Sequence, residues 1–404
     1  MKTRIAVFLG GRSPEHDVSV VTGLQALQAL DQSRFEPFVV YVTTQGDWLV
    51  GPGLDDRRSY LPDAQIRAKL TEVALDIAAG GGGRLVPRKS GLFSRRAPVE
   101  FDVALLAFHG LGGEDGQMQG LCESANLPYT GMRTLASAVL MDKAATKRML
   151  ESAGIPLLRH IVVDRPETGL PAASVLDPRL ANIGFPCCVK PAHLGSSIGV
   201  GKADTTEEVR ALLAAIFRLD TQALIEPFVP NLVEYNVSVA RFGGLPRCSA
   251  IERPKRVEDL LDFRQKYLSG GGDNKSGGKN LVQPSEGMLS LTREINPDLP
   301  EAQADEIRRW ALAAFEAVGG TGAPRIDFLC NDATREIWLN EVNPCPGSFA
   351  FYLWEAAPGP PDSAGPLGFT ALLSALIDEA QARHRAMQLP DDPVPPDARL
   401  LRRP

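Results

Sequence analysis

Short hydrophobic runs alternate with amphipathic stretches at the start of the chain. Residues 5–9 are continuously apolar and are followed by Gly-Gly, a pattern typical of a buried parallel strand. Ser13 is suited to cap a following helix with Pro14 in its first position, and apolar residues then recur at helical spacing over 18–30. This order of strand, turn and helix predicts the first unit of a parallel α/β sheet.

Further elements are predicted along the rest of the chain. Strands are expected at 38–43, 103–108, 187–191, 223–229, 235–242, 325–329 and 337–343. Helices are expected at 135–150, 301–318 and 369–385. Residues 51–100 combine a glycine run with a basic cluster, so we predict a poorly structured, solvated insertion there. The proline-rich residues 390–404 are expected to form a frayed tail.

Length, net charge and the lengths of apolar runs disfavour some classes of function. The chain has 404 residues, of which 44% are hydrophobic, and a formal net charge of −6. The length predicts two or three domains, and the mild acidity gives no electrostatic reason to expect nucleic acid as a partner. No apolar run approaches the roughly 20 residues that span a bilayer. We therefore expect a cytoplasmic protein without a membrane partner.

The clearest chemical signal lies in the last two predicted strands. Arg325 and Asp327 alternate with apolar residues and so face one side of the sheet, as do Glu341 and Asn343 on the next strand. Two carboxylates and an amide oxygen are hard ligands suited to Mg²⁺ that bridges nucleotide phosphates. Arg325 would offer a planar donor fork to a transferring phosphoryl group. An ordinary ion pair between adjacent strands is the alternative.

Two other segments are suited to the rest of a nucleotide. Lys190 closes a buried strand and precedes the turn 195–197, whose backbone N–H groups can hold phosphate oxygens. Residues 226–229 can present backbone groups to an adenine ring, and Glu234 leaves a carboxylate for the ribose hydroxyls. Gly-Ser turns and strand edges are also common on ordinary surfaces, which is the alternative for each segment.

Six motifs follow one another in an order that points to a known family. They are Gly10-Gly11-Arg12-Ser13-Pro14-Glu15-His16-Asp17-Val18-Ser19, His109-Gly110-Leu111-Gly112-Gly113-Glu114-Asp115-Gly116, Met141-Asp142-Lys143, Val189-Lys190-Pro191 with Leu194-Gly195-Ser196-Ser197-Ile198-Gly199, Arg325-Ile326-Asp327 and Glu341-Val342-Asn343. Together they resemble the D-alanine–D-alanine ligases of the ATP-grasp superfamily. The resemblance covers about 1–50, 101–202 and 223–347.

The resemblance implies an ATP-grasp fold of the α/β class, α+β in parts, with three domains. An N-terminal parallel-sheet domain would occupy 1–132, and nucleotide would lie between a central subdomain at 133–233 and a C-terminal subdomain at 234–404. A mobile lid is expected at about 254–290. The resemblance also implies a homodimer formed through the first domain.

The resemblance implies roles for individual residues as well. The residues expected to hold ATP are Lys143, Lys190, Ser196, Ser197, Glu226, Val229, Glu234 and Lys266. Two Mg²⁺ ions, or Mn²⁺ in their place, would be ligated by Asp327, Glu341 and Asn343. The expected catalytic residues are Glu15, Ser196, Tyr267, Arg325 and Gly347, and the amino-acid substrates would contact Glu15, His109, Arg325, Gly347 and Tyr352.

Two departures from the family pattern affect the second substrate. Tyr352 stands, by spacing from Asn343, where the family usually has a serine that binds the carboxylate of the second substrate. A phenol can still donate one hydrogen bond, but it changes the volume of the pocket. Simple packing of Tyr352 at a helix start is the alternative. The lid is also longer than usual, with residues 270–280 inserted.

Four functions therefore remain to be weighed. The leading hypothesis is ADP-forming ligation of two D-alanines for peptidoglycan precursors, and its nearest rival is a relative that joins another amino acid or amine. A nucleotide-binding regulator without turnover would not need a full set of metal ligands. A dinucleotide-dependent oxidoreductase is disfavoured because the first Gly-rich turn lacks G-x-G-x-x-G spacing.

Overall fold

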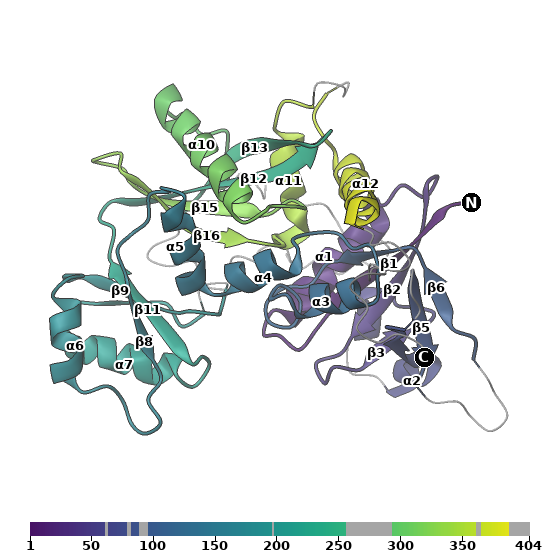
Figure 1. Ribbon diagram of the computed structural model, residues 1–404, viewed down its shortest axis with the longest axis horizontal. Helices are drawn as coiled ribbons and strands as arrows, with labels where there is room; N and C mark the ends of the chain where they lie inside the picture. The colour runs from purple at the N-terminus through teal and green to yellow at the C-terminus, as the bar shows by residue number, and fades with distance from the viewer. Residues whose placement is uncertain are drawn as a thin grey trace, which may run out of the picture.

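The computed structural model contains three separate β-sheets with helices packed against them (Figure 1). The residues that it describes are 1–60, 64–78, 82–88, 96–195, 198–255, 293–360 and 365–387. Strands and helices alternate along much of the chain. The predicted α/β fold class is confirmed.

The N-terminal sheet has seven strands in the order β6-β5-β4-β3-β2-β1-β7. β1 (Thr3–Gly10) lies parallel to both β2 (Phe35–Val42) and β7 (Val103–Leu106), which confirms the predicted parallel core. Residues 5–9 of β1 have no exposed surface. Burial on both faces explains why this strand is apolar throughout, since α3 (Gln117–Ser124) covers one face and α1 (His16–Ala29) the other.

The predicted poorly structured insertion at 51–100 is wrong for the described part of that range. η1 (Arg57–Tyr60) and α2 (Ala64–Lys69) fall inside it. Three antiparallel strands there continue the sheet beyond β3 (Trp48–Val50): β4 (Thr71–Leu75), β5 (Gly83–Pro87) and β6 (Val99–Phe101). Each is only three to five residues long, so the alternation of buried and exposed positions is too short to stand out from the sequence.

The second sheet has four antiparallel strands in the order β10-β9-β11-β8. They are β8 (Ile161–Asp164), β9 (Cys187–Pro191), β10 (Gly201–Ala203) and β11 (Gln222–Pro227). Hydrophobic side chains of α6 (Ala173–Leu180) and α7 (Thr206–Ile216) pack against Val189 and Ile225. Because side chains alternate along a strand, Lys190 and Glu226 point away from this core.

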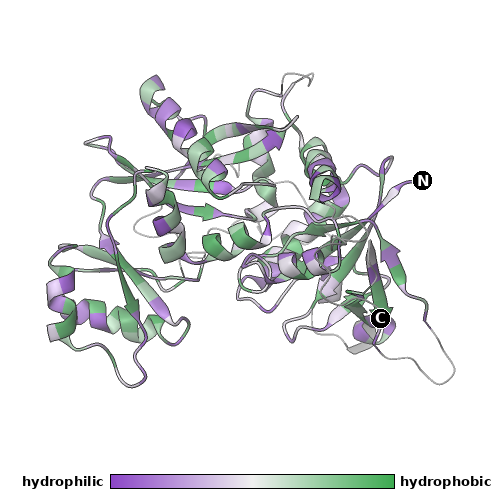
Figure 2. Ribbon diagram, in the orientation of Figure 1, coloured by the Kyte–Doolittle hydropathy of each residue, from purple (hydrophilic) through white to green (hydrophobic). Residues whose placement is uncertain are grey.

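The third sheet has five strands in the order β14-β13-β12-β15-β16. They are β12 (Leu232–Phe242), β13 (Leu245–Pro254), β14 (Arg293–Ile295), β15 (Arg325–Asn331) and β16 (Ile337–Asn343). α10 (Glu301–Ala317) buries Ile307 and Phe315 against the hydrophobic face, which includes Ile326 and Phe328. Figure 2 shows the strands of all three sheets as largely hydrophobic, while α10 also carries hydrophilic stretches.

Two short helices lie between the sheets, where a single helix at 135–150 is predicted. They are α4 (Thr134–Met141) and α5 (Lys143–Ser152), and the break falls at Asp142, which has an extended backbone. The side chain of Asp142 accepts hydrogen bonds from the backbone N–H groups of Ala144 and Ala145 at 2.8 and 2.9 Å. Asp142 therefore caps α5, and the cap sets the direction in which the lysines of that helix point.

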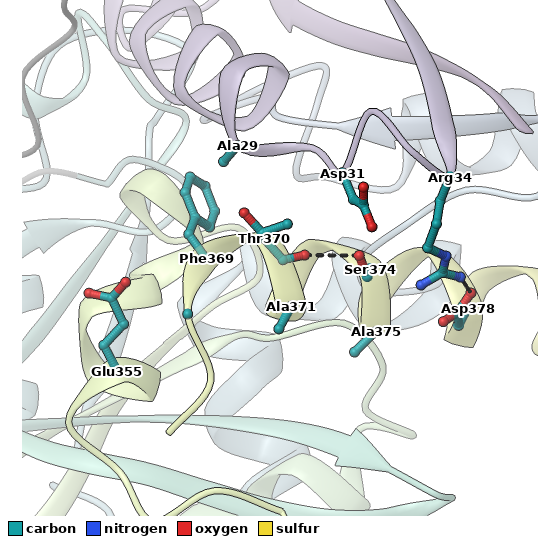
Figure 3. Close-up of a pocket in the computed structure, with 11 residues that line it drawn as sticks. Ala29, Asp31, Arg34, Glu355, Phe369, Thr370, Ala371, Ser374, Ala375 and Asp378 are labelled. Atoms are coloured by element: carbon teal, nitrogen blue, oxygen red, sulfur yellow. Dashed lines mark hydrogen bonds and ion pairs between the residues drawn. The ribbon is translucent and has the colours of Figure 1, made fainter. Parts of the chain in front are cut away.

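The end of the described chain returns to the N-terminal sheet. η2 (Gly347–Ala350) and α11 (Phe351–Glu355) lead to α12 (Phe369–Met387), whose hydrophobic side chains share one cluster with Ile5 and Val7. A cavity of about 810 Å³ lies where α12 meets the end of α1 (Figure 3), beside the 2.7 Å ion pair between Arg34 and Asp378. None of the predicted site residues that the structure describes lines this cavity. Among the described residues, no helix combines the length and apolar character that a membrane crossing requires.

Candidate active site

A row of polar side chains crosses the third sheet on the face opposite α10. The strand register places Asn236 of β12 between Glu252 of β13 and Asp327 of β15, and Asp327 beside Glu341 of β16. The side chain of Asn236 donates a hydrogen bond to Glu252 at 2.8 Å. The predicted pairing of two carboxylates on adjacent strands is therefore present.

Arg325 and Asp327 form a bidentate ion pair at the centre of this row. Nε and Nη2 of the guanidinium each donate to one carboxylate oxygen at 2.7 Å, and Asn343 stands opposite Arg325 on β16. Burial opposes the charge of Arg325, but Asp327 outweighs it, so the pKa of the guanidinium is raised. Arg325 thus holds the carboxylate that the sequence assigns to a metal.

The predicted metal ligands supply oxygen atoms only. Asp327, Glu341 and Asn343 offer two carboxylates and one carboxamide, a donor set that fits Mg²⁺. In the part of the chain that the structure describes, no three His, Cys, Asp or Glu side chains are grouped as a metal site. A metal ion would therefore need the amide oxygen of Asn343, or oxygens from a bound nucleotide, to complete its shell.

Two predicted phosphate-binding lysines reach this row from the neighbouring elements. Nζ of Lys143, the first residue of α5, lies 3.6 Å from a carboxylate oxygen of Glu341. Nζ of Lys190 on β9 donates at 3.0 Å to the side chain of Asn340, next to Glu341. The structure therefore brings both lysines to the carboxylates that are proposed to bind metal.

Glu226 has a different environment from the one expected for a residue at an adenine ring. Its carboxylate is 1% exposed and forms ion pairs with Lys147 and with Lys190, the latter at 2.5 Å. Burial disfavours the ionised form, but Lys190 and Lys147 outweigh it and lower the pKa of Glu226 to about 2. Lys147, which sequence reasoning missed, follows Lys143 by one helical turn, and that i,i+4 spacing of two lysines was the available signal.

Two further residues predicted at the nucleotide, Val229 and Glu234, are among the described residues. Val229 follows β11 and is 5% exposed, and Glu234 lies on β12, one strand from Arg325 and Asp327. Four of the predicted residues, Ser196, Ser197, Lys266 and Tyr267, lie outside the described residues, as does most of the predicted lid.

Glu15 meets two glycine-containing loops. It is the N-cap of α1, which begins at His16 rather than at Pro14 as predicted, and it is 9% exposed. A Cβ atom at Gly110 would lie 2.7 Å from a carboxylate oxygen of Glu15, and one at Gly195 would lie 3.5 Å away. Gly110 also has a φ of +76°, so both its backbone and its surroundings require glycine.

His109 is buried behind this loop and is held as a neutral imidazole. Its Nε2 lies 2.9 Å from the hydroxyl of Thr22, which also accepts a hydrogen bond from the backbone N–H of Ser348 at 3.2 Å. Burial, with a smaller effect of Arg325, lowers the pKa of His109 to about 4. His109 therefore acts here as part of a fixed network that joins α1 to the turn after Gly347.

Glu114 is a second buried carboxylate that the sequence did not assign to the site. Its oxygens accept hydrogen bonds from the backbone N–H groups of Gly110 at 2.5 Å and Cys345 at 2.9 Å. Burial, and then the nearby charge of Glu15, raise the pKa of Glu114 to about 8. Its place in the His-Gly motif was the available signal, because that motif is followed by an acidic pair.

Tyr352 packs against a hydrophobic cluster and also contacts charged side chains. The guanidinium of Arg293 lies 4.4 Å from the centre of its ring, and Arg293 also pairs with Glu252 at 3.1 Å. Burial and then the negative charge of Glu252 raise the pKa of Tyr352. Phe349 and Trp354 are buried, so the packing alternative fits those two residues better than it fits Tyr352.

The turn after Gly347 has an unusual backbone. Ser348, Phe349 and Ala350 have φ angles of +51°, +56° and +49°, in the left-handed region that residues with side chains rarely adopt. Such strain persists where the surroundings fix it, here through the contacts of Ser348 with Thr22 and Gln25 on α1. The backbone beside Gly347 is therefore fixed relative to His109 and Glu15.

Comparisons with known proteins agree with this geometry. Residues 4–132 match the family described as D-ala D-ala ligase N-terminus, and residues 149–377 match D-ala D-ala ligase C-terminus. The chain is 30% identical over 395 residues to a D-alanine–D-alanine ligase of Geobacillus thermodenitrificans, covering 96% of this chain and 98% of that one. It is 33% identical over 398 residues to the ligase of Mycolicibacterium smegmatis, covering 95% and 96%.

Solved structures give the same fold. The D-alanine–D-alanine ligase of Coxiella burnetii matches with a TM-score of 0.73 at 24% identity, covering 95% of each chain. The VanG D-Ala:D-Ser ligase of Enterococcus faecalis matches with a TM-score of 0.72 at 22% identity, covering 94% of this chain and all of that one. The predicted ATP-grasp fold is confirmed, and the chain belongs to the D-alanine–D-alanine ligase family of ATP-dependent ligases.

Proposed function

We propose that this protein joins two D-alanine molecules through an acyl phosphate, with conversion of ATP to ADP and phosphate, and so supplies a peptidoglycan precursor. The observation that carries the proposal is the meeting of Lys143, Lys190 and Arg325 with two strand-borne carboxylates, Asp327 and Glu341. The family of the chain and the relatives that it resembles over nearly their whole length support the choice of D-alanine.

The reaction needs positioning and charge neutralisation more than covalent chemistry by the protein. A carboxylate oxygen of the first amino acid attacks the γ-phosphorus, the bond to the β,γ-bridging oxygen breaks, and ADP leaves. The amine of the second amino acid then attacks the acyl carbon, loses a proton, and phosphate leaves as the amide bond forms. Lys143 and Lys190 would neutralise phosphate oxygens, and Arg325 would stabilise the charge on the transferring phosphoryl group.

Asp327, Glu341 and Asn343 would hold Mg²⁺, which when bound offsets the charge between the nucleotide and the acid. For Asp327 to serve, its bidentate pair with Arg325 has to open. Both partners would then contact the phosphoryl group or its metal instead of each other. The ion pair therefore keeps both groups neutralised and in place before nucleotide arrives.

The amino-acid end of the site would be shaped by the N-terminal loops. The carboxylate of Glu15 would bind the ammonium group of the first amino acid, because it faces the junction of the loops at Gly110 and Gly195. His109, neutral and tied to Thr22, would orient the adjoining turn toward the first substrate. Arg325 and the backbone at Gly347 would complete the first-substrate pocket.

A second candidate function is ligation of another amino acid or amine. The cluster of Tyr352, Glu252 and Arg293 favours it, because the negative charge of Glu252 near the phenol disfavours a substrate carboxylate there. Release of phosphate from ATP, measured with every pairing of D- and L-amino acids, separates the two candidates. The proposal expects the highest rate with D-alanine alone; a clear preference for a different acceptor would replace it with the second candidate.

We also propose that the enzyme works in the cytoplasm as a homodimer. The supply of ATP and of free amino acids there supports the first part, and the resemblance of residues 4–132 to the N-terminal domain of the family supports the second. Sedimentation equilibrium of the full chain tests the second part, with a mass near twice 43.5 kDa as the expected result.

A further inference from the structure

A fully buried cluster of three charges lies behind the phosphate end of the site. Lys147 of α5 and Glu226 of β11 have side chains that are each 2% exposed, and that of Lys190 on β9 is 8% exposed. Figure 1 shows α5 between the sheet that contains β9 and β11 and the sheet that contains β16. Lys147 and Glu226 therefore join α5 to the second sheet, and the hydrogen bond from Lys190 to Asn340 joins that sheet to β16, where nucleotide is proposed to bind.

The two lysines occupy different oxygens of one carboxylate. Lys190 pairs with Oε2 of Glu226 at 2.5 Å, while Lys147 pairs with Oε1. The cluster thus contains two cations for a single anion, although each buried charge without a partner costs several kcal/mol. A surplus buried cation is costly unless an anion arrives to pair with it, and the phosphates of a nucleotide are such anions.

Only one of the two lysines is placed to meet that anion. Lys190 is the more exposed, and its Nζ already donates to Asn340 at 3.0 Å, beside Glu341. Lys147 lies deeper, with Nζ 3.5 Å from the backbone carbonyl of Leu158. Lys190 can turn toward phosphate, but if it were the sole partner of Glu226, that movement would leave a buried carboxylate unpaired.

We propose that Lys147 is a positioning residue that keeps Glu226 neutralised, and thereby frees Lys190 to bind the phosphates of the nucleotide. This inference rests on the proposed ATP-dependent function but does not depend on which amino acids are joined. Lys147 itself touches no substrate. It acts through Glu226, because Lys147 pairs with one carboxylate oxygen and Lys190 with the other.

Calorimetric titration of the full chain with ADP and with adenosine, both in EDTA, tests this division. In Lys147→Met, Lys190 becomes the only partner of Glu226, so ADP affinity should fall by roughly 10- to 100-fold, the worth of one charge-assisted hydrogen bond. Adenosine carries no phosphate, so its affinity should change by less than about threefold on the same reasoning. Arg148→Met, which removes an exposed positive charge from the same helix, should leave both affinities unchanged.

A double variant gives the second readout. Glu226→Gln removes the anion that ties Lys190, so adding Lys147→Met to Glu226→Gln should cause no further loss of ADP affinity. The inference is overturned if Lys147→Met weakens ADP and adenosine equally, or if it weakens ADP equally with and without Glu226→Gln. Failure of the unsubstituted chain to bind ADP both in EDTA and in excess Mg²⁺ would overturn the proposed function together with this inference, whereas failure of D-alanine turnover alone would leave the inference standing.

Discussion

Two buried glutamates of the same site are held in opposite charge states. Glu226, at the phosphate end, has a pKa lowered to about 2 because Lys190 and Lys147 outweigh the cost of burial. Glu114, at the amino-acid end, has a pKa raised to about 8 by burial and by the charge of Glu15, and the donors to it among the described residues are backbone N–H groups. Both carboxylates are buried, so the cationic neighbours of Glu226 account for the opposite directions of the two pKa shifts.

This contrast divides the site into a charged end and a more neutral end. The phosphate end gathers lysines and carboxylates on strands and on a capped helix, which suits an anionic, metal-bound nucleotide. The amino-acid end contains a neutral imidazole at His109 and a largely protonated Glu114, held by the turn at residues 345–350. The charged end can therefore attract phosphate, while the more neutral end can orient a small amino-acid substrate.

The largest expected effect comes from Glu341, whose negative charge influences both ends. Glu341→Gln should lower the rate of ADP formation by at least about a hundredfold, since it removes a metal-binding oxygen and a partner of Lys143. The melting temperature should change little because the side chain is 28% exposed. Rates are measured by coupled ADP release. Near-normal turnover would remove Glu341 from the metal site.

The next largest effect is expected on the free energy of unfolding, which should fall more when Glu226 is replaced than when Glu114 is replaced. Glu226→Leu leaves two buried ammonium groups without a counter-ion and should lower the free energy of unfolding by about 3–5 kcal/mol. Glu114→Leu removes a group that is mostly uncharged and should cost about 1–3 kcal/mol, the penalty for two backbone donors left unpaired. Chemical denaturation of both variants measures the difference. Equal losses would contradict the opposite charge states.

Sequence reasoning located the charged end better than the neutral end. Arg325, Asp327 and Glu341 could be placed because alternation along two adjacent strands fixes which side chains share a face. The contact between Lys147 and Glu226 could not be placed, because it depends on how α5 and β11 meet in space and on the break at Asp142. Glu114 and Glu252 were missed for a related reason, since a partner of each lies far away in the chain: Cys345 for Glu114 and Arg293 for Glu252.

Substitution of Tyr352, at the predicted pocket for the second amino acid, should have an intermediate effect on catalysis. Tyr352→Phe removes only the hydroxyl, which feels the negative charge of Glu252, and Tyr352→Ser also frees the volume that the ring occupies. If Tyr352 shapes the acceptor pocket, kcat/KM for the second amino acid should change by about tenfold or more in Tyr352→Ser, while KM for ATP stays within about twofold. Steady-state rates across several acceptors provide the measurement. An unchanged acceptor profile in both variants would make Tyr352 a packing residue.

The smallest expected effect is the dependence of stability on pH that Glu114 introduces. Its pKa is raised from 4.5 to about 8 in the folded protein, so the folded state binds more protons than the unfolded state between these values. Its contribution to stability is therefore fully present below about pH 4.5 and is lost as the pH rises through about 8. The melting temperature should accordingly fall more steeply from pH 5 to pH 8 in the unsubstituted protein than in Glu114→Gln. Parallel curves for the two proteins would mean that Glu114 is ionised throughout, and the amino-acid end would then be as charged as the phosphate end.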